Sequence, residues 1–320
     1  MVRARLKNKT IFMTGGSGFI GSSIAERLVD KNKIIIYDNC RRFSPLLKGI
    51  LRHKNLTFIK GDVLDAKKLG KSMPGKPDIV MHLAAIAGVS SYYKMPAETM
   101  TTNIIGAHNV LNALRGKRLK RYVNFSTSEI YARHADRVRE DGETVQGEMK
   151  ERRWTYSLSK LAAEKLSFCH YWERKLPVVS IRPFNVYGPG QVGEGAIQIF
   201  ITRALKNKNI YITGNGRQVR AWCYIDDLIG GVFACLRAKK AVGNTFNIGN
   251  DKAAITMVNL ARMVISLAGS KSRIYFRPHV GTDIDLRVPN IEKAKRMLKY
   301  KPHVSLEKGL AKTIEWHKKL

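Results

Sequence analysis

The first half of the chain alternates short apolar runs with longer stretches in which apolar positions recur at helical spacing. The short runs, rich in β-branched residues, predict strands at residues 10–14, 33–38, 56–60, 78–83, 121–126 and 178–182. The longer stretches predict helices at residues 19–31, 96–114 and 155–175. Strands and helices that alternate in this way form a parallel sheet with helices on both faces. We therefore expect an α/β fold with a doubly wound parallel sheet.

The regular alternation weakens from Asn185 onward, where glycine and proline become frequent. We expect residues 1–184 to form the sheet domain and residues 185–320 mainly a smaller C-terminal lobe, with the segment at about 221–265 returning to the first domain. The chain has neither internal repeats nor a low-complexity linker. The two regions should therefore share an interface, with a ligand bound between them.

Composition excludes several classes of protein. The 320 residues are 44% hydrophobic and 26% charged, and no apolar run reaches the length of about 18 residues that a membrane helix needs. The opening residues contain no apolar signal core, and the 4 cysteines are far apart and form no C-x-x-C pair. Such cysteines are typical of reduced thiols rather than of disulfides or zinc sites. We expect a cytoplasmic protein with neither a metal nor a membrane partner.

The chain is strongly basic. Lysine and arginine outnumber aspartate and glutamate by 57 to 25, which gives a formal net charge of +32. An excess of this size raises nucleic acid as a partner. The basic residues are scattered, however, and no helix-turn-helix, zinc-finger or RNP pattern is present. We expect no specific nucleic-acid recognition, and the charge favours an anionic ligand such as one that carries phosphate.

Gly15, Gly18 and Gly21 stand directly after the first predicted strand and open the first predicted helix. A turn without Cβ atoms lets the backbone approach a pyrophosphate, and the helix N-terminus offers it unpaired N–H groups. Residues 188–193 match the same glycine spacing and also lie between a strand and a helix, so the pattern alone decides little. An acidic residue at the end of the next strand singles out the first set as the candidate dinucleotide site.

That acidic residue is Asp38, whose carboxylate can accept hydrogen bonds from both adenosine ribose hydroxyls and repel a 2′-phosphate. Its presence favours NAD over NADP, although Arg41 and Arg42 nearby could accommodate the phosphate. Asp62 and Val63 follow the third strand, where they can meet the adenine. The alternative for Asp62 is a helix cap, which is as common for an aspartate after a strand.

Tyr156 and Lys160 lie one helical turn apart, so both side chains emerge on one face of the predicted helix. A nearby ammonium favours the phenolate and can make a buried tyrosine a general base near neutrality. Tyr171 and Lys175 have the same spacing but lie close to the helix end. The first pair is favoured because the hydroxyl residues at 126–128 end a strand, and strand ends meet the following helices at the crevice of such a sheet.

Several segments occur in order along nearly the whole chain: TGGSGFIG, the acid in YDN, HLAA, FSTSEIY, YSLSK, RPFNVYGPG and RAWCYIDD. Together they resemble the extended short-chain dehydrogenase/reductase family, specifically its NAD-dependent nucleotide-sugar epimerases and dehydratases of the UDP-glucose 4-epimerase type. The resemblance implies a Rossmann-type domain that holds NAD and a smaller lobe that binds a nucleoside-diphosphate sugar. It also implies a homodimer formed through the helices at residues 96–114 and 155–175.

The resemblance implies that a sugar carbon, usually C4, gives hydride to NAD while the Tyr156 phenolate removes the hydroxyl proton. Lys160 would bind the nicotinamide ribose and lower the tyrosine pKa, and Thr127 would hydrogen-bond the reacting sugar oxygen. Ser128 and Glu129 complete the expected catalytic set. The residues expected to hold NAD are Gly15, Gly18, Phe19, Ile20, Gly21, Asp38, Asn39, Asp62, Val63, Leu83, Ala84, Ala85, Asn103, Ser126, Tyr156 and Lys160.

For the substrate, the resemblance implies that Asn185 grips the diphosphate and that Arg220 and Arg287 neutralise its phosphates. In a chain this basic, a solvated surface position is the ordinary alternative for any one arginine. The Thr-Ser-Glu segment ending at Glu129 is similar to that of GDP-mannose-type 4,6-dehydratases and UDP-glucuronate decarboxylases, where the glutamate acts near C5. Ser128 stands where dehydratases with an Asp-Glu pair have their acid, which weakens that route. An ion pair or a surface position is the alternative for Glu129.

We expect first a 4-epimerase of a UDP-hexose or a UDP-uronic acid, because this reaction requires least of Glu129. The alternatives are decarboxylation of UDP-glucuronate or 4,6-dehydration of a nucleotide sugar, both using Glu129. A more remote alternative from another class is a catalytically silent NAD- or RNA-binding protein on the same fold, against which the intact Tyr156, Lys160 and Thr127 count.

Overall fold

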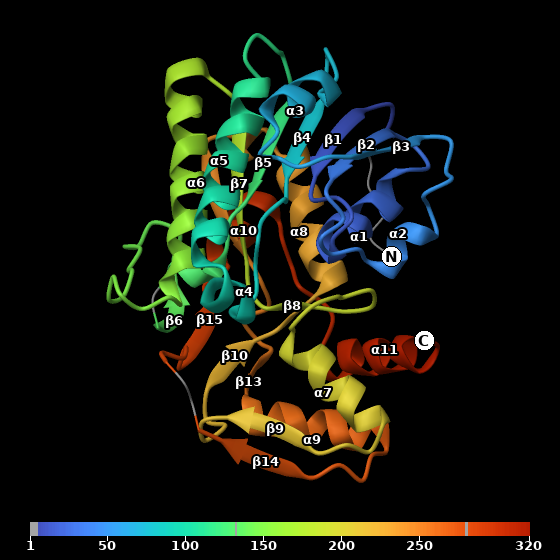
Figure 1. Cartoon of the computed structure of the whole chain (residues 1–320), viewed down its shortest axis with the longest axis vertical. Coiled ribbons are helices and arrows are strands. Elements are labelled where there is room, and N and C mark those ends of the chain that lie inside the picture. Colours follow the sequence, from blue (N-terminus) through green and yellow to red (C-terminus); the bar gives the residue numbers. More distant parts are fainter. Residues whose placement is uncertain (1–5, 132, 279–280) are drawn as a thin grey trace.

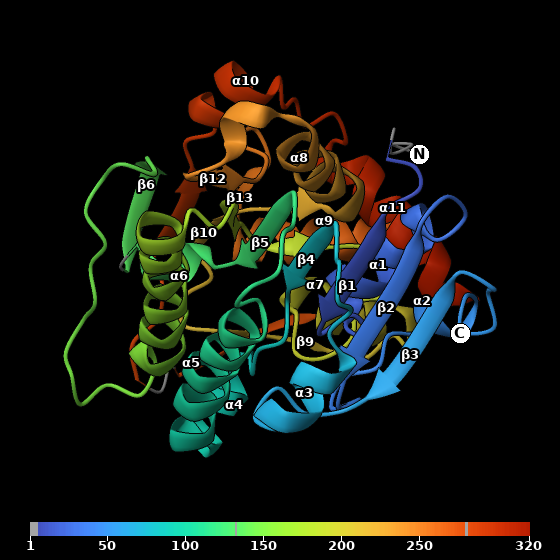
Figure 2. The ribbon, with the colours of Figure 1, turned by 90° about the horizontal axis from the view of Figure 1, so that it is seen from above.

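The computed structural model describes residues 6–131, 133–278 and 281–320 (Figure 1). A large parallel sheet lies between two layers of helices, and a smaller region of short strands and helices lies at one end of it (Figures 1 and 2). Among the helices of these residues, none is long and apolar enough to cross a membrane.

Seven strands form the large sheet, and all of them run parallel. In chain order they are β1 (Thr10–Thr14), β2 (Lys33–Asp38), β3 (Leu56–Lys60), β4 (Ile79–His82), β5 (Arg121–Phe125), β7 (Val178–Pro183) and β12 (Asn244–Ile248). Their order across the sheet is β12-β7-β5-β4-β1-β2-β3, so the chain leaves β1 in one direction and resumes at β4 in the other. This confirms the expected doubly wound α/β fold, whose crevice lies between β1 and β4.

The strands are buried on both faces because helices cover each side of the sheet. Ile11 and Met13 of β1 join one apolar core, whereas Phe12 between them joins the other. In the first core lie α1 (Phe19–Leu28) and α8 (Ile225–Arg237). In the second lie α3 (Ala66–Ser72), α5 (Pro96–Ala113) and α6 (Trp154–Arg174). Continuous apolar runs such as KIIIYD in β2 follow from this two-sided burial.

The smaller region is built around a four-stranded sheet in the order β13 (Ala254–Thr256), β10 (Val219–Ala221), β15 (Leu286–Pro289) and β6 (His134–Val138). Two strand pairs accompany it, β8 (Val186–Tyr187) with β11 (Cys223–Tyr224) and β9 (Ile210–Thr213) with β14 (Ile274–Arg277). The helices here are α7 (Ala196–Leu205), α9 (Met257–Ala268) and α11 (Leu306–Lys318). β6 comes from the first half of the chain but belongs to the smaller region, whereas β12 comes from the second half and belongs to the large sheet. The chain therefore crosses between the two regions more than once, and the boundary at residue 184 stays a prediction.

The remaining elements are short connections. They are α2 (Pro45–Lys48), α4 (Val89–Lys94), α10 (Glu292–Leu298) and the two 3-10 turns Ser128–Ile130 and Lys239–Ala241. α4 and α5 are separated only by Met95, because Pro96 opens α5 and disfavours a helical residue before it. The first of the 3-10 turns follows β5 and carries Glu129 toward the crevice.

A buried ion pair ties the large sheet to its helices. Arg182 of β7 lies 3.0 Å from the carboxylate of Glu164 on α6, and the two side chains are 8% and 4% exposed. Thr245 of β12 donates a hydrogen bond to the same carboxylate at 2.8 Å, and Arg182 also donates one to the hydroxyl of Tyr131. Two strands and a helix are thus joined by charges that are shielded from water, and either charge left alone would be costly.

We expect Glu164→Gln to lower the free energy of unfolding by about 3 kcal/mol, because it leaves the Arg182 charge buried without its partner. Urea denaturation followed by circular dichroism measures the change. The matched control is Glu315→Gln, which removes one carboxylate of an exposed pair with Lys319 and should cost less than about 0.5 kcal/mol. Equal effects of the two substitutions would contradict the role given to the buried pair.

Candidate active site at the carboxyl edge of the sheet

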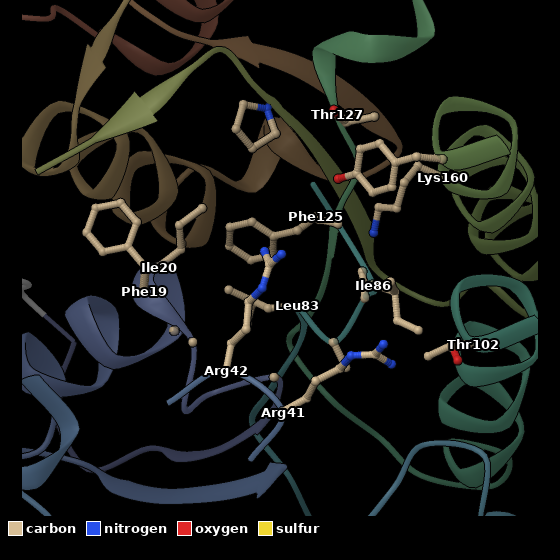
Figure 3. A pocket seen from close by; sticks show the side chains of 18 of the residues that line it. Phe19, Ile20, Arg41, Arg42, Leu83, Ile86, Thr102, Phe125, Thr127 and Lys160 are labelled. Carbon is tan, nitrogen blue, oxygen red and sulfur yellow. The ribbon is translucent and has the colours of Figure 1, made fainter. Parts of the chain in front are cut away.

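A cleft of about 440 Å³ opens at the carboxyl ends of the parallel strands, where the strand order reverses. Its wall is formed by the turns after β1, β2, β4 and β5, by α6 and by residues of the segment 183–192 that enters the smaller region. Figure 3 shows Thr127 and Lys160 on one side of the cleft and Phe19 and Ile20, at the start of α1, on the other. The cleft therefore lies in the first region, and residues 183–192 form its wall where the chain enters the smaller region.

The turn after β1 passes so close to the end of β4 that only glycine fits there. Gly15 has a φ of +72°, and a Cβ on it would lie 2.4 Å from the backbone nitrogen of Ala84. A Cβ on Gly21 in α1 would lie 2.6 Å from the Cα of Gly16 in the same turn. Gly18 precedes the first residue of the helix. The backbone N–H groups at the start of α1 can thus meet a bound anion closely.

Asp38 ends β2 at the edge of the cleft and is 8% exposed. Its carboxylate accepts hydrogen bonds from the backbone N–H groups of Ser17 and Cys40, at 3.0 and 2.8 Å. Ser17 belongs to the glycine turn, so Asp38 holds that turn in place as well as facing the cleft. The sequence predicted that Asp38 faces the cleft, but it did not predict that Asp38 holds the glycine turn.

The residues that follow β2 and β3 either line the cleft or form a local hydrogen-bond network. Asn39 lines the cleft and donates to the carboxylate of Asp62 at 2.8 Å. Asp62 also accepts from the N–H of Leu64 at 2.9 Å and is not among the cleft-lining residues, whereas Val63 is. Asp62 therefore fixes a local turn, whereas the N-cap of α3 is Asp65, whose side chain accepts from the N–H of Lys68.

Residues 83–85 follow β4 and line the cleft, as the sequence predicts. Asn103 of α5 lies behind them and does not reach the cleft. It accepts a hydrogen bond from the N–H of Ile86 at 2.8 Å and donates to the carbonyl of Ile86 and to the hydroxyl of Ser159 on α6. Asn103 is thus a buried crosslink that holds the segment after β4 against α6.

The hydroxyl segment and the tyrosine–lysine pair come together in the structure. Ser126, Thr127 and Ser128 follow β5, Tyr156 and Lys160 lie on α6, and all of them line the cleft. The two helical residues face the strand end because α6 packs against β5 and β7. The spacing in the sequence therefore predicted a real convergence of side chains.

The two look-alike patterns lie elsewhere. Tyr171 packs against Phe168, and Lys175 ends α6 in the left-handed conformation, with a φ of +56°. In the glycine set at residues 188–193, a Cβ on Gly190 would lie 2.4 Å from the side chain of Leu46. These glycines therefore satisfy close packing between the two regions of the chain rather than forming a turn at a helix start.

Burial governs the charges of the tyrosine–lysine pair. It raises the pKa of Tyr156 to about 12, against the opposing effects of the Thr127 hydroxyl and the positive charge of Arg42. Burial lowers the pKa of Lys160 to about 8, although the carboxylate of Glu164 opposes this shift. At neutral pH the protein's own groups therefore keep Tyr156 as a phenol and Lys160 as an ammonium.

Glu129 lies in the cleft wall beside three arginines. Arg153, at the start of α6, is 3.2 Å from its carboxylate, and the Glu129 side chain is 29% exposed. Burial raises the pKa of Glu129, but the charges of Arg287, Arg153 and Arg220 together outweigh it and hold the pKa below its usual range. We call Arg153, Arg220 and Arg287 the arginine cluster. Asp283 contacts this cluster at 3.4 Å from Arg220, and the negative charge of Asp285 also acts on Arg220.

Of the three residues expected at the diphosphate, only Asn185 lines the cleft, where its side chain donates to the carbonyl of Ala221 at 2.9 Å. Arg220 is turned away and donates to the carbonyl of Ile284 at 2.6 Å. Arg287 is 1% exposed and donates to the backbone carbonyl of Ser128. Neither arginine holds the surface position that was its alternative, and both act on the cleft from behind its wall.

Sequence reasoning missed Arg153 and gave Arg42 only a secondary part. Arg153 stands three residues before Tyr156, a spacing that places both on one helical face and could have pointed to it. Arg42 extends into the cleft in Figure 3. Its guanidinium passes close to Gly88 and Gly193, both with positive φ, where a side chain would press against it.

Metal chemistry has no support from the side chains that the structure describes. Within residues 6–131, 133–278 and 281–320, no group of three or more histidine, cysteine, aspartate or glutamate side chains could hold a metal ion. His82, at the end of β4, is fully buried with Nδ1 2.7 Å from the hydroxyl of Thr14. Burial and the charge of Lys160 lower its pKa to about 3, so His82 is neutral and part of the core.

Comparison with known proteins identifies the family. Residues 11–249 match the model of the NAD dependent epimerase/dehydratase family, and the chain belongs to this family. This confirms the resemblance drawn from the sequence motifs. The protein is therefore an enzyme, and its cofactor is NAD.

Relatives match the chain over nearly its whole length. A UDP-N-acetyl-alpha-D-glucosaminuronate decarboxylase of Bacillus cytotoxicus is 32% identical, with 98% of each chain covered. A UDP-glucuronic acid 4-epimerase of Bacillus cereus, solved with UDP-glucuronic acid and NAD, has a TM-score of 0.88 and 30% identity, with 97% of this chain and 99% of that one covered. An epimerase of Methanothermobacter thermautotrophicus has a TM-score of 0.91 at 27% identity, with 98% and 93% covered.

The described residues fit the cofactor of the family. The glycine turn leaves no Cβ between a pyrophosphate and the start of α1, where N–H groups are unpaired. The Asp38 carboxylate stands at the edge of the same cleft, as recognition of a ribose without a 2′-phosphate requires. Of the two nearby arginines, Arg41 is paired with Glu98, and Arg42 extends into the cleft (Figure 3).

We expect Gly15→Ala to lower the NAD content of the purified protein by at least about tenfold, because the added Cβ must push the turn away from Ala84. Absorbance of the nucleotide released on denaturation measures the content. The matched control is Gly70→Ala in α3, where a Cβ meets nothing within 4 Å. It should leave the NAD content unchanged, and a similar NAD content in both variants would contradict the role given to the turn.

The lowered pKa of Lys160 predicts a pH dependence of stability in the NAD-free protein. Between pH about 8 and 10.5 the unfolded chain keeps a proton on Lys160 that the folded chain has lost, so stability rises with pH in this window. We expect Lys160→Met to be more stable than the wild type by about 3 kcal/mol at pH 7, with the difference vanishing above pH about 10.5. Urea denaturation at several pH values measures it. A difference that does not change with pH would contradict the buried charge.

Proposed function

We propose that the chain is a UDP-sugar 4-epimerase whose substrate is a UDP-uronic acid, within the wider class of UDP-hexoses and UDP-uronic acids. The observation that carries the proposal is the combination of a tyrosine–lysine–threonine set that lines the cleft with an arginine cluster behind the wall at Glu129. The first suits oxidation and reduction at C4. The second suits a substrate that carries a negative charge beyond its diphosphate.

In this proposal Tyr156 takes the proton of the C4 hydroxyl and returns it, and Thr127 orients the sugar oxygen by a hydrogen bond. NAD, when bound, supplies the acceptor and later the donor of the hydride, and its charged nicotinamide ring favours the phenolate. Lys160 holds the nicotinamide ribose and adds its ammonium charge to the same effect. Burial keeps water from competing for the proton, since Tyr156 and Lys160 lie deep in the cleft.

Glu129 is suited to ionic packing rather than to proton transfer. Glu129 contacts Arg153 and has a lowered pKa, so its carboxylate is a weak base. Removal of a proton from C5 needs a stronger base than this. This disfavours 4,6-dehydration, which begins with removal of the C5 proton. Epimerisation requires only that the oxidised sugar turn in the cleft and take hydride on its other face.

The arginine cluster bears on what happens to a carboxylate at C5 of the sugar. The positive charges of the cluster hold Glu129 ionised, and the same field favours an anionic group of the substrate. A positive field stabilises the carboxylate relative to neutral carbon dioxide, and interactions stronger in the ground state than in the transition state slow a reaction. We therefore propose that the carboxylate is retained and that Arg220 and Arg287 act by charge from behind the wall, with Asn185 at the diphosphate.

The second candidate is a decarboxylase of a UDP-uronic acid. It is favoured by the 32% identity to the Bacillus cytotoxicus decarboxylase over 98% of both chains. An oxidised C4 makes a neighbouring carboxylate easy to lose, so the same tyrosine–lysine pair serves this reaction.

We further propose a cytoplasmic homodimer formed through α5 and α6, where Ile105 is 43% exposed.

The test is the identity of the product from UDP-glucuronate and NAD. We expect a product of unchanged mass whose H4 proton resonance and couplings differ from those of the substrate in the NMR spectrum, which identifies inversion at C4. Loss of carbon dioxide in the mass spectrum would establish the decarboxylase instead, and loss of water the dehydratase. Tyr156→Phe is the control for chemistry outside the site, and it should keep NAD while losing turnover.

Glu129→Gln separates the same alternatives by rate. If Glu129 only packs against the arginines, kcat should fall by no more than about tenfold, whereas loss of a general base costs about a hundredfold or more. Steady-state assays of the product give both values. A loss as severe as that of Tyr156→Phe in an enzyme that yields only the epimer would contradict the assignment of Glu129.

A further inference from the structure

The strand pair β9 and β14 carries exposed aromatic side chains at the end of the molecule away from the large sheet (Figure 1). Tyr211 and Tyr275 stand opposite each other in register and are 36% and 44% exposed. Their rings lie 6.0 Å apart, and the guanidinium of Arg277 lies 3.6 Å from the ring centre of Tyr211. We call β9 and β14 the aromatic ribbon. None of its residues lines the cleft.

Basic side chains extend the ribbon at both ends. Exposed Lys208 and Arg273 precede the two strands, and exposed Arg217 follows the turn after β9. The segments at residues 195–225 and 252–282, which form most of the smaller region, each contain 5 lysines and arginines and no aspartate or glutamate. No acidic residue of these segments offsets the charge of the ribbon, so an anionic polymer would find cations on either side of the rings.

We propose that the aromatic ribbon binds single-stranded RNA without sequence preference. Bases of any kind stack on aromatic rings, while flanking cations neutralise the phosphates. The rings are only partly exposed, which suits a stacked base better than insertion into a bilayer. Arg277 and Arg203 already lie over the ring of Tyr211, so Tyr275 is the main platform for a base. RNA presents unpaired bases in loops and single strands, whereas duplex DNA stacks its bases internally. Such binding is consistent with the lack of a motif for specific recognition and is independent of the proposed reaction.

The test titrates the full chain into a fluorescein-labelled oligouridylate and follows the anisotropy. Tyr275→Ala should weaken binding about tenfold, because one stacking platform is lost. The control Trp172→Ala removes an equally exposed aromatic residue on α6, 53% exposed, and should leave the affinity unchanged. An abasic oligomer of the same length should bind weakly and be insensitive to Tyr275→Ala, since it offers phosphates without bases.

A second pair of variants tests the charges. The double substitution Lys271→Gln with Arg273→Gln removes two cations beside the ribbon, and Lys117→Gln with Arg118→Gln removes two from a basic cluster in the other region. The first should weaken binding and lower the salt slope by about 1.4, and the second should do neither. Equal losses from the two doubles, an unchanged affinity in Tyr275→Ala, or binding to phosphatidylserine vesicles but not to the oligouridylate would overturn the proposal. Unchanged thermal melting of each variant shows that it is folded.

Discussion

The contact between the turn after β1 and the end of β4 is the constraint on which the rest of the structure depends. Gly15 approaches Ala84 so closely that any side chain would drive the two segments apart. Because the contact lies where the strand order reverses, it sets the width of the cleft. Asp38 fixes the same turn from the other side by accepting the N–H of Ser17. The cofactor side of the cleft is thus preorganised by backbone packing and by the Asp38 carboxylate.

The opposite wall is organised by charge. Lys160 is buried with a lowered pKa, Tyr156 with a raised one, and Glu129 is held ionised by the arginine cluster. Each of these groups is costly to bury without a counterpart, so the wall is matched to a ligand that brings its own charges. The large positive net charge of the whole chain would also draw an anionic ligand toward the cleft from a distance.

The fold and the heart of the site could be predicted from the sequence because they rest on local patterns. Two-sided burial gives each strand a continuous apolar run, and the spacing of Tyr156 and Lys160 fixes them on one helical face. The arginine cluster could not be predicted in this way, because Arg153 meets Glu129 only after α6 has packed beside the turn that follows β5. The pairing of β6 with β15 was hidden for the same reason, since its partner is far away in the sequence.

Epimerases and decarboxylases among the relatives match this chain equally well, and the physical reason lies in what the two reactions share. Both need oxidation at C4, so both need the tyrosine, the lysine and the glycine turn, which are the residues that dominate a comparison of sequences. They differ only in whether a neighbouring carboxylate stays charged, and a difference of about 1.4 kcal/mol in its stabilisation changes the ratio of the two rates tenfold. In the function proposed above, the arginine cluster, rather than the catalytic pair, supplies that difference.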